Sequence, residues 1–304
     1  ERQAQVRLAP QIEALRSDLE RAFAVAFDEH AHVLTLYASH DDALACLREH
    51  ALSTESGSPA DPDRQGPLHL DIRFCGSVDA IRALNEGRCE MAGFHTRQAP
   101  APGSLAERTY KPLLRPGKHK IIGFAQRTQG LMVARGNPLG ITGLRDVQRL
   151  AARFINRARG TGTRVLLDEL LLQEGIAPES IVGFGHTEPS HAAVAHMVAS
   201  GRADVALGIE LAARQQGLEF IALVQENYHL VCLRSSLEQP ATRSLRAVLR
   251  SSAWQSQLAA MTGYQPAHSG EVLSLRALLP WWQFKGHKSG NLRTDGRSGA
   301  TRSS

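Results

Sequence analysis

Long apolar runs and aromatic side chains are scarce in this sequence. No uninterrupted apolar stretch reaches the roughly 18 residues that a membrane-spanning helix needs, so we expect no contact with a membrane. Phe, Trp and Tyr together make up 5% of the 304 residues, so a core must come mostly from Leu, Ala, Val and Ile. A chain of this length has room for two medium-sized lobes or one large domain.

Cysteines are also few, and their spacing excludes the commonest zinc and redox motifs. None of them forms a C-x-x-C pair, and they stand apart at Cys46, Cys75, Cys89 and Cys232. Each lies among apolar neighbours, which predicts four buried free thiols and a reducing, cytoplasmic compartment. No secretory signal peptide is recognisable and there is no initiator Met, so we interpret the sequence as a fragment whose missing N-terminus could carry any further module.

The net charge of +5 is concentrated at the C-terminal end. Residues 285–304 carry five Lys or Arg against a single acid, Asp295, in a stretch rich in Gly and Ser. Such a composition predicts a disordered basic tail, for which nonspecific contact with nucleic acid is the functional alternative. The remaining residues are close to neutral, so the basic character says little about a ligand.

An amphipathic helix is predicted near the start of the chain, within residues 5–30. Its apolar residues recur at helical spacing: Val6, Ile12, Leu15, Leu19, Phe23 and Phe27. We assign residues 1–30 to an N-terminal linker helix. It could connect to a preceding module, pair two chains in a homodimer, or pack on its own domain, and the sequence leaves these alternatives open.

After this helix, short apolar strands alternate with helices, which predicts an α/β fold with parallel-rich sheets. The predicted strands are 33–37, 68–74, 89–94, 121–125, 131–134, 153–156, 181–184, 205–208, 220–224 and 229–233. The predicted helices are 42–50, 78–86, 144–150, 165–174, 191–200, 241–260 and 270–279, with surface loops at 53–67 and 98–118.

Two such series, joined by long strand segments near 121–134 and 220–233, predict a two-lobed molecule in which the chain crosses between lobes twice. Lobe I comprises residues 31–125 plus 229–284, and lobe II comprises residues 126–228. Ligands of open α/β sheets bind at the carboxyl ends of the strands. In two facing lobes these ends meet across a cleft.

The turns that follow the strands are rich in hydroxyls, small residues and histidines. They include Ser39-His40, Gly76-Ser77, His95-Thr96, residues 159–164 and the segment 187–191 with Ser190. Each turn precedes a helix, whose N-terminus offers free backbone N–H groups and a partial positive charge. Several such termini aimed at one cleft predict an anion site, although simple N-capping explains any single one of them.

The Arg159-Gly160-Thr161-Gly162-Thr163-Arg164 loop carries the strongest signal for an anion. Its glycines let backbone N–H groups converge, and Thr161 and Thr163 add hydroxyl donors. Either arginine could supply a fork of donors, and we favour Arg159 as the contact and Arg164 as a support. The loop matches neither a Walker A motif nor G-x-G-x-x-G, which disfavours a nucleotide.

Charged and aromatic residues in the two crossings are further candidates. Arg127 lies in the first crossing and needs either a ligand or an interlobe ion pair. Tyr228 lies in the second and could either close on the ligand or pack as a hinge aromatic. His40, His95 and His191 each follow a strand end, but no carboxylate or Cys completes a metal site and no nucleophile elbow is present, so we expect neither metal, cofactor nor catalytic residues.

Taken in order, these segments resemble the type 2 periplasmic-binding-protein fold. The stretches that carry the resemblance are ASHD (38–41), GSVDA (76–80), MAGFH (91–95), QGLMVARGNP (129–138), FINR (154–157) with the loop 159–164, and TEPSHAAVA (187–195). The similarity is greatest to the cytoplasmic branch, in which this domain follows a winged helix-turn-helix of the molybdate-responsive regulator type or is fused to molybdopterin-biosynthesis proteins.

The resemblance implies a ligand site and a partner. The implied site contains Ser39, Ser77, Arg127, Thr161, Gly162 and Thr163, together with His95 and Tyr228. The loop is also similar to the Arg-plus-Ser-Gly-Thr loop of tungstate-binding proteins, with Thr161 where many relatives have Ser. The winged helix lies outside this sequence, so DNA as a partner is implied by the resemblance alone.

We therefore predict the sensor domain of a transcriptional regulator, binding a small oxyanion such as molybdate or tungstate, or a small carboxylate, between two lobes. Its predicted ligand residues are Ser39, His40, Gly76, Ser77, His95, Arg127, Arg159, Thr161, Gly162, Thr163, Ser190 and Tyr228. The alternatives are a solute receptor of an ABC-type transporter and an enzyme or accessory protein of molybdenum cofactor assembly.

Overall fold

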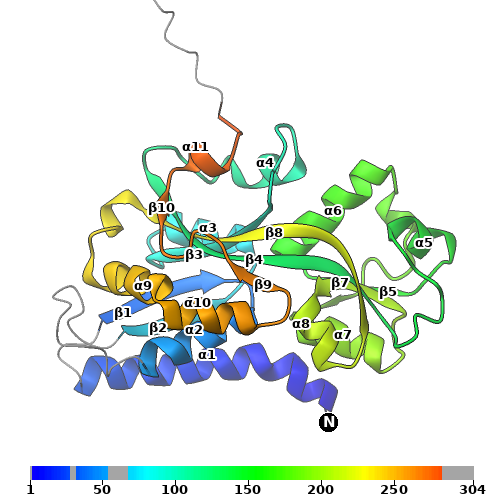
Figure 1. Cartoon of the computed structure of the whole chain (residues 1–304), viewed down its shortest axis with the longest axis horizontal. Coiled ribbons are helices and arrows are strands. Elements are labelled where there is room, and N and C mark those ends of the chain that lie inside the picture. The colour runs from blue at the N-terminus through cyan, green and yellow to red at the C-terminus, as the bar shows by residue number, and fades with distance from the viewer. Residues whose placement is uncertain (1, 28–31, 54–67, 283–304) are drawn as a thin grey trace, which may run out of the picture.

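A computed structural model describes residues 2–27, 32–53 and 68–282 (Figure 1). The predicted surface loop at 53–67 lies, apart from Ser53, outside these residues, and so does the predicted basic tail at 285–304. The described chain forms two lobes that share one curled mixed sheet, with helices on both of its faces (Figure 1).

The sheet has the strand order β2-β1-β3-β8-β4-β7-β5-β6, with β9 and β10 paired to β4. Its strands are β1 (His32–Ala38), β2 (Leu68–Phe74), β3 (Met91–Arg97), β4 (His119–Val133), β5 (Phe154–Arg157), β6 (Thr187–Glu188), β7 (Val205–Ile209), β8 (Glu219–Leu233), β9 (Tyr264–Pro266) and β10 (Val272–Leu273). Pairing is parallel within β2-β1-β3 and within β7-β5-β6, as the alternation of strands and helices predicts.

The helices cover the lobes and one of them underlies both. They are α1 (Arg2–Phe27), α2 (Asp42–Ser53), α3 (Ser77–Asn85), α4 (Leu105–Tyr110), α5 (Leu144–Arg149), α6 (Gly162–Glu174), α7 (His191–Ala199), α8 (Glu210–Gln215), α9 (Pro240–Arg250), α10 (Ser252–Ala260) and α11 (Leu275–Leu278). Among the helices described, none has both the length and the apolar character required to cross a membrane.

The long strands β4 and β8 connect the lobes as one antiparallel pair, seen in the centre of Figure 1. Each is a single strand of 15 residues, whereas the sequence predicts an interruption near residues 126–130 and 227. The strands continue because their polar side chains pair with each other across the ladder, which a hydrophobic pattern cannot reveal. The predicted lobe boundaries, 125/126 and 228/229, lie opposite each other here, since Ala125 is the register partner of Tyr228.

Three predicted elements are wrong, each for a local reason. Residues 181–184 are not a strand, because Gly183 has a left-handed φ of 82°. The predicted helix at 241–260 is two helices, because Ser251 is extended and its hydroxyl accepts the N–H of Trp254 at 3.2 Å, starting α10 anew. In the predicted helix at 270–279, only residues 275–278 are helical, as α11, because residues 272 and 273 form β10 and pair with β4.

The Pro-rich connection at 98–118 contains a helix that the sequence analysis does not predict. Ser104 caps α4 by accepting the N–H of Glu107 at 3.2 Å, and the Glu107 carboxylate accepts the N–H of Gly103 at 2.6 Å. This S-x-x-E capping pattern is the signal for the helix.

The four cysteines are free thiols; Cys89 and Cys232 are buried as predicted, but Cys46 and Cys75 are only half-buried.

Close backbone approach in the crossing pair requires glycine at residue 130. A Cβ there would lie 2.2 Å from the carbonyl oxygen of Ile221 on β8. We expect Gly130→Ala to lower the free energy of unfolding by about 1–3 kcal/mol, because the strands must separate locally to admit the methyl group. Urea denaturation measures this, with Gly185→Ala as control, since no atom lies within 4 Å of a Cβ at that position. Equal stability of the two variants would contradict the argument.

Candidate functional site

A buried arginine, Arg127, lies where the two lobes meet. Its Nη1 donates to Asp41, which follows β1, and its Nε donates to Glu226 on β8. All three side chains are buried. Tyr264 donates to the Asp41 carboxylate at 2.8 Å, and Gln129 donates to Glu226 at 2.8 Å. Arg127, predicted as a ligand contact, is thus fully engaged in an ion-pair network, which is the alternative that the sequence analysis left open.

A second buried arginine, Arg157, has no such partners. It is the last residue of β5, and its side chain is 1% exposed. Within the described residues, its Nε and Nη1 have no hydrogen-bond acceptor. Burial, and then the charge of Arg127, lower the pKa of Arg157 to about 9, an effect that Asp41 only partly offsets. The guanidinium therefore remains a cation at neutral pH, and it is buried without a hydrogen-bonded counter-ion.

Other buried polar atoms in the same region also have no hydrogen-bond partner among the residues that the structure describes. They are Ser39 Oγ, His95 Nε2, Gln129 Oε1, His191 Nδ1 and Tyr228 Oη. We call these five residues, together with Arg157, the interlobe cluster. Leaving one buried polar group unsatisfied costs about 1–3 kcal/mol, so six such residues in one region indicate a binding site more than a packing defect.

Contacts on each side of the interlobe cluster connect some of its members with each other and with their neighbours. The rings of His95 and Tyr228 lie 3.9 Å apart, and the Arg127 guanidinium lies 5.4 Å from the Tyr228 ring. On the side of lobe II, Thr163 Oγ1 lies 3.4 Å from His191 Nε2 and accepts the amide N–H of Gln129 at 3.0 Å. The cluster thus draws on β1, β3, β4, β5, α7 and β8.

The two histidines of the cluster are neutral at physiological pH. Burial is the largest cause that lowers the pKa of His95 well below its usual range, followed by the charge of Arg127. The pKa of His191 is lowered by burial and then by the charge of Arg157. A neutral imidazole has one N–H donor and one acceptor, so each can donate to an anion without adding charge. The positive field that lowers both pKa values also attracts a negative ligand.

The lobes are in contact around the cluster, and two glycines allow it. A Cβ on Gly76, before α3, would lie 2.8 Å from the carbonyl oxygen of Gly160 in the anion loop. A Cβ on Gly162, the first residue of α6, would lie 2.7 Å from His95 Nδ1. The N–H of Val78 also donates to Gly160 across the gap at 3.3 Å. This geometry is that of a closed pair of lobes.

Several predicted residues cap helices near the cluster. Thr161 Oγ1 accepts the N–H of Arg164 and donates to a backbone carbonyl, so it caps α6. Ser190 Oγ caps α7 by accepting the N–H of Ala193 at 3.1 Å. Ser77 begins α3 and lies 3.4 Å from His95 Nδ1. Capping is thus the observed role of two predicted hydroxyls, while those of Ser39 and Thr163 face the interlobe cluster.

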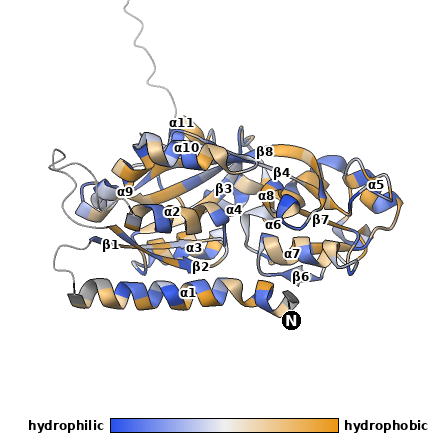
Figure 2. Cartoon of the chain, turned by 60° about the horizontal axis from the view of Figure 1, so that its bottom comes forward, coloured by the Kyte–Doolittle hydropathy of each residue, from blue (hydrophilic) through white to orange (hydrophobic). Residues whose placement is uncertain are grey.

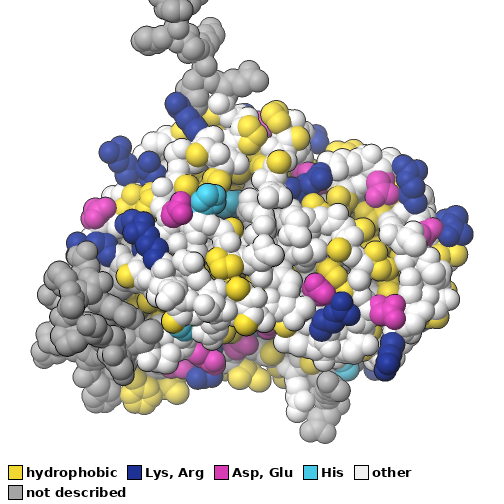
Figure 3. All heavy atoms as spheres, viewed as in Figure 1, with side chains coloured by type: hydrophobic (Ala, Val, Ile, Leu, Met, Phe, Trp, Pro, Cys, Tyr) yellow, Lys and Arg dark blue, Asp and Glu magenta, His cyan; other side chains and the backbone are white. Residues whose placement is uncertain are grey.

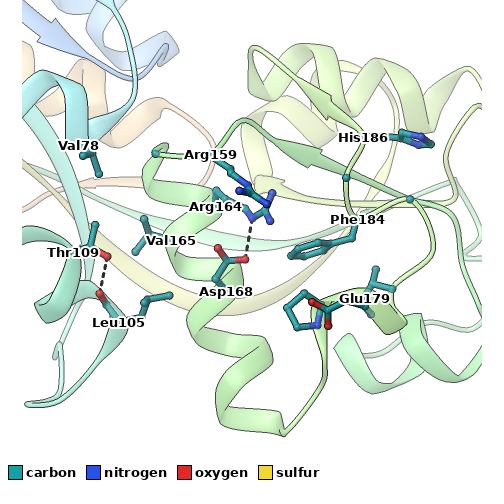
Figure 4. A pocket seen from close by; sticks show the side chains of 15 residues that line it. Val78, Leu105, Thr109, Arg159, Arg164, Val165, Asp168, Glu179, Phe184 and His186 are labelled. Atoms are coloured by element: carbon teal, nitrogen blue, oxygen red, sulfur yellow. Dashed lines mark hydrogen bonds and ion pairs between the residues drawn. The ribbon is translucent and has the colours of Figure 1, made fainter.

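Arg159 and His40 do not join the cluster. Arg159 is exposed and lines an open surface groove beside Arg164, which pairs with Asp168 at 2.9 Å and stacks on Phe184 (Figure 4). His40 lies 3.4 Å from Glu13 of α1 and packs on the Phe74 ring. The preference for Arg159 as the ligand contact thus finds no support in its position, and Arg164 is held by Asp168 and Phe184.

The sequence analysis missed the residue best placed to hold an anion. Arg157 closes the short apolar strand FINR, directly before the predicted loop. A basic residue at the carboxyl end of a buried strand is itself a signal, because this is where α/β sheets bind ligands. Gln129, two residues after Arg127 on β4, is a second cluster residue that the sequence analysis does not predict. In the described parts of the chain, no three His, Cys, Asp or Glu side chains come together as a metal ion would require.

Comparison with known proteins agrees with this architecture. The chain is 32% identical to the uncharacterised protein YvgK of Bacillus subtilis (strain 168) over 201 aligned residues. The alignment covers 66% of this chain and 64% of YvgK, so the chain spans less than two thirds of that relative. The structure is similar to the tungstate ABC transporter protein of Geobacter sulfurreducens, with a TM-score of 0.53 and 13% identity over 75% of this chain and 98% of that one.

A similar fold occurs in the effector-binding domain of QuiR in complex with shikimate, with a TM-score of 0.51 and 13% identity over 72% of this chain and 95% of that one. These likenesses at low identity concern the fold. The family assignment comes from the sequence, since the PBP superfamily domain matches residues 61–250, more than half of the chain. The chain therefore belongs to the PBP-like family, the PBP superfamily domain.

Proposed function

We propose that this chain is the ligand-sensing domain of a cytoplasmic transcriptional regulator and that it binds a small oxyanion at the interlobe cluster. Molybdate, tungstate and small carboxylates are the ligands considered. The output is read by a DNA-binding module, as the resemblance to molybdate-responsive regulators implies. Binding, without catalysis, is the whole task of the domain.

The observation that carries the proposal is the buried cation of Arg157. A buried charge is costly unless it is paired, and the acceptors that would pair it are absent among the described residues. An oxyanion would accept a hydrogen bond from Nε or Nη1 of Arg157, which lie on different edges of the guanidinium, and further hydrogen bonds from Ser39, Tyr228 and one or both histidines. Several unsatisfied donors would then have a partner, and the negative charge would compensate the arginine.

The enclosed position of the cluster favours a small ligand. Arg157, Tyr228 and His95 are no more than 3% exposed, so a ligand held by them would be enclosed between the lobes. The ligands named for the similar structures, tungstate and shikimate, are both small anions. They support the ligand class that we propose without selecting one member of it.

The position of α1 favours a sensor. This helix contacts lobe I through β2 and lobe II through α7, and Arg7 pairs with Glu188 of β6 at 2.8 Å (Figure 2). Glu188 is two residues before Ser190, and Glu13 of α1 contacts His40, the neighbour of Ser39. Lobe closure and the seating of α1 are therefore linked. A ligand shifts such an equilibrium only by its differential affinity for the two states, which donors from both lobes provide.

A transport receptor is the second candidate. The same cleft serves a receptor that delivers its ligand to a permease, and the similarity to a tungstate ABC transporter protein favours that possibility. An accessory role in molybdenum cofactor assembly uses the same binding site. The contacts of α1 with both lobes favour the sensor, because a receptor has no need to report closure through this helix.

The ligand proposal is tested with melting curves and one pair of variants. Among molybdate, tungstate, sulfate, phosphate, formate and thiosulfate, at least one should raise the melting temperature by mass action. Arg157→Met should weaken binding of that anion about 10- to 100-fold, because the guanidinium charge and its hydrogen bond to the anion are lost. Without ligand, the variant should melt no lower than the parent, since an unpaired buried charge is removed.

Arg159→Met is the matched control, because Arg159 is exposed and outside the cluster. It should leave the affinity unchanged in isothermal titration calorimetry. Equal losses in the two variants, or a loss only in Arg159→Met, would place the anion in the surface groove instead. No stabilisation by any anion would contradict the ligand class.

Affinity should also depend on pH in one direction. The cation is the form of Arg157 that binds an anion, so affinity is retained below its pKa of about 9 and is lost as the pH rises through it. Above that pH, the dissociation constant should rise roughly tenfold per pH unit. Titration of a fully ionised anion between pH 7 and about 10.5 measures this. A flat profile in the parent chain would exclude Arg157 as the main contact.

The link between α1 and closure is tested at the ion pair with lobe II. Arg7→Ala should weaken anion binding by up to about fivefold, the range of a half-exposed ion pair, because only the closed state loses the contact with Glu188. Arg21→Ala is the control, since Arg21 pairs with Asp71 on lobe I only, at 3.4 Å. Equal affinity of both variants and the parent would remove α1 from the closure equilibrium.

A further inference from the structure

The first helix, α1, has its polar side against the protein and its large apolar side chains outside. Ser17 is buried and bonds the edge strand β2, with the N–H of Ile72 donating to its Oγ at 2.9 Å. Asp18 pairs with Arg73 at 2.5 Å, also on β2. This arrangement reverses the usual amphipathic helix, which buries its apolar stripe.

The outer side of α1 is a continuous apolar stripe. Its exposed fractions are 46% for Leu8, 59% for Ile12, 69% for Leu15, 59% for Leu19 and 55% for Phe23. At about 100° per residue, these five positions fall within an arc of about 80°, directly opposite Ser17. We call this set the outer stripe. Hydrophobic side chains are visible along the lower rim of the surface in Figure 3, where α1 lies.

The charged residues of α1 do not define the partner, because each is already engaged within the chain. Between residues 4 and 23, whose side chains the structure describes, the contacts are Arg7 with Glu188, Glu13 with His40, Arg16 with Glu20, Asp18 with Arg73, and Arg21 with Asp71. The outer stripe thus presents an apolar surface, and the charged residues beside it on α1 are paired within the chain. That composition disfavours an anionic membrane or a nucleic acid, which select unpaired basic residues.

The spacing of the outer stripe makes it complementary to itself. Its members follow one another at intervals of 4, 3, 4 and 4 residues, which is close to the alternation of 3 and 4 in a two-helix seam. The positions are also symmetric about a point just after Leu15. An antiparallel copy of the helix therefore places Ile12 opposite Leu19, and Leu8 opposite Phe23, while the two Leu15 side chains meet near the twofold axis. An interface formed by one patch twice requires this property.

We infer that the outer stripe is the dimer interface of this protein, covered by the outer stripe of a second copy in antiparallel orientation. Figure 2 shows α1 as the outermost layer along one side of the molecule, so a second helix reaches it over its whole length. A helix of 26 residues extends over about 39 Å, enough for the whole stripe to pair. This inference does not depend on which ligand the lobes bind.

The mass of the full chain in solution tests the inference. We expect sedimentation equilibrium to give twice the chain mass of 33.1 kDa, and Leu15→Glu to give a single chain mass, because two buried carboxylates would meet at the axis. The matched control is Leu172→Glu, which changes another exposed leucine, 62% exposed, on α6. It should remain a dimer. Unchanged melting temperatures of the lobes show that both variants fold.

The orientation is tested by cross-linking. Chains with Ile12→Cys mixed with chains with Leu19→Cys should form a disulfide-linked mixed dimer under mild oxidation, well above the parent chain, whereas Ile12→Cys alone should not. Cross-linking of Ile12→Cys with itself would mean a parallel pair and would overturn the antiparallel arrangement.

Other outcomes overturn the inference as a whole. They are a parent chain that is monomeric at about 100 μM, well above ordinary dimer dissociation constants, a dimer that persists in Leu15→Glu, and a monomer that binds anionic vesicles through Leu15. The second result would place the dimer interface elsewhere on the chain, and the third would assign the stripe to a membrane surface.

Discussion

The ion-pair network of Arg127 is the interaction on which the rest of the structure depends. It joins Asp41 of lobe I to Glu226 of β8, at the middle of the only strand pair in the described chain that runs through both lobes. Because two buried carboxylates compensate this arginine, it serves as a strut between the lobes. Another buried arginine, Arg157, has no such compensation, and the contrast between the two is the basis of the proposed site.

The division of roles continues outward from this centre. Arg127 fixes where the lobes meet, Arg157 with hydroxyls and neutral imidazoles offers donors to an anion, and α1 extends beneath both lobes. The inner polar side of α1 contacts the neighbours of site residues, while its apolar outer stripe faces away. A change in lobe closure and a dimer contact would therefore meet on one helix. This arrangement suits a sensor, in which ligand binding must be communicated to another part of an assembly.

The sequence predicts the strands of lobe I closely because their alternation is local; the predicted strand 68–74 is β2 itself. It also predicts that turns after the strands gather at one cleft; of the predicted site residues, His95 and Tyr228 lie together, with their rings 3.9 Å apart. What it cannot predict depends on contacts between distant residues. The pairing of Arg127 with Asp41 and Glu226, far apart in sequence, decides that Arg157 rather than Arg127 is left for a ligand. Likewise, the helical spacing of α1 indicates an apolar stripe, but only the structure shows that this stripe faces outward.

The most direct test of the central claim is a crystal structure with the anion that stabilises the protein most, using anomalous scattering if that anion is tungstate or molybdate. The account predicts the anion between the closed lobes, with an oxygen within about 3 Å of Arg157 Nε or Nη1 and other oxygens near Ser39 and Tyr228. An anion bound instead beside Arg159 in the surface groove, with Arg157 left unpaired, would contradict it.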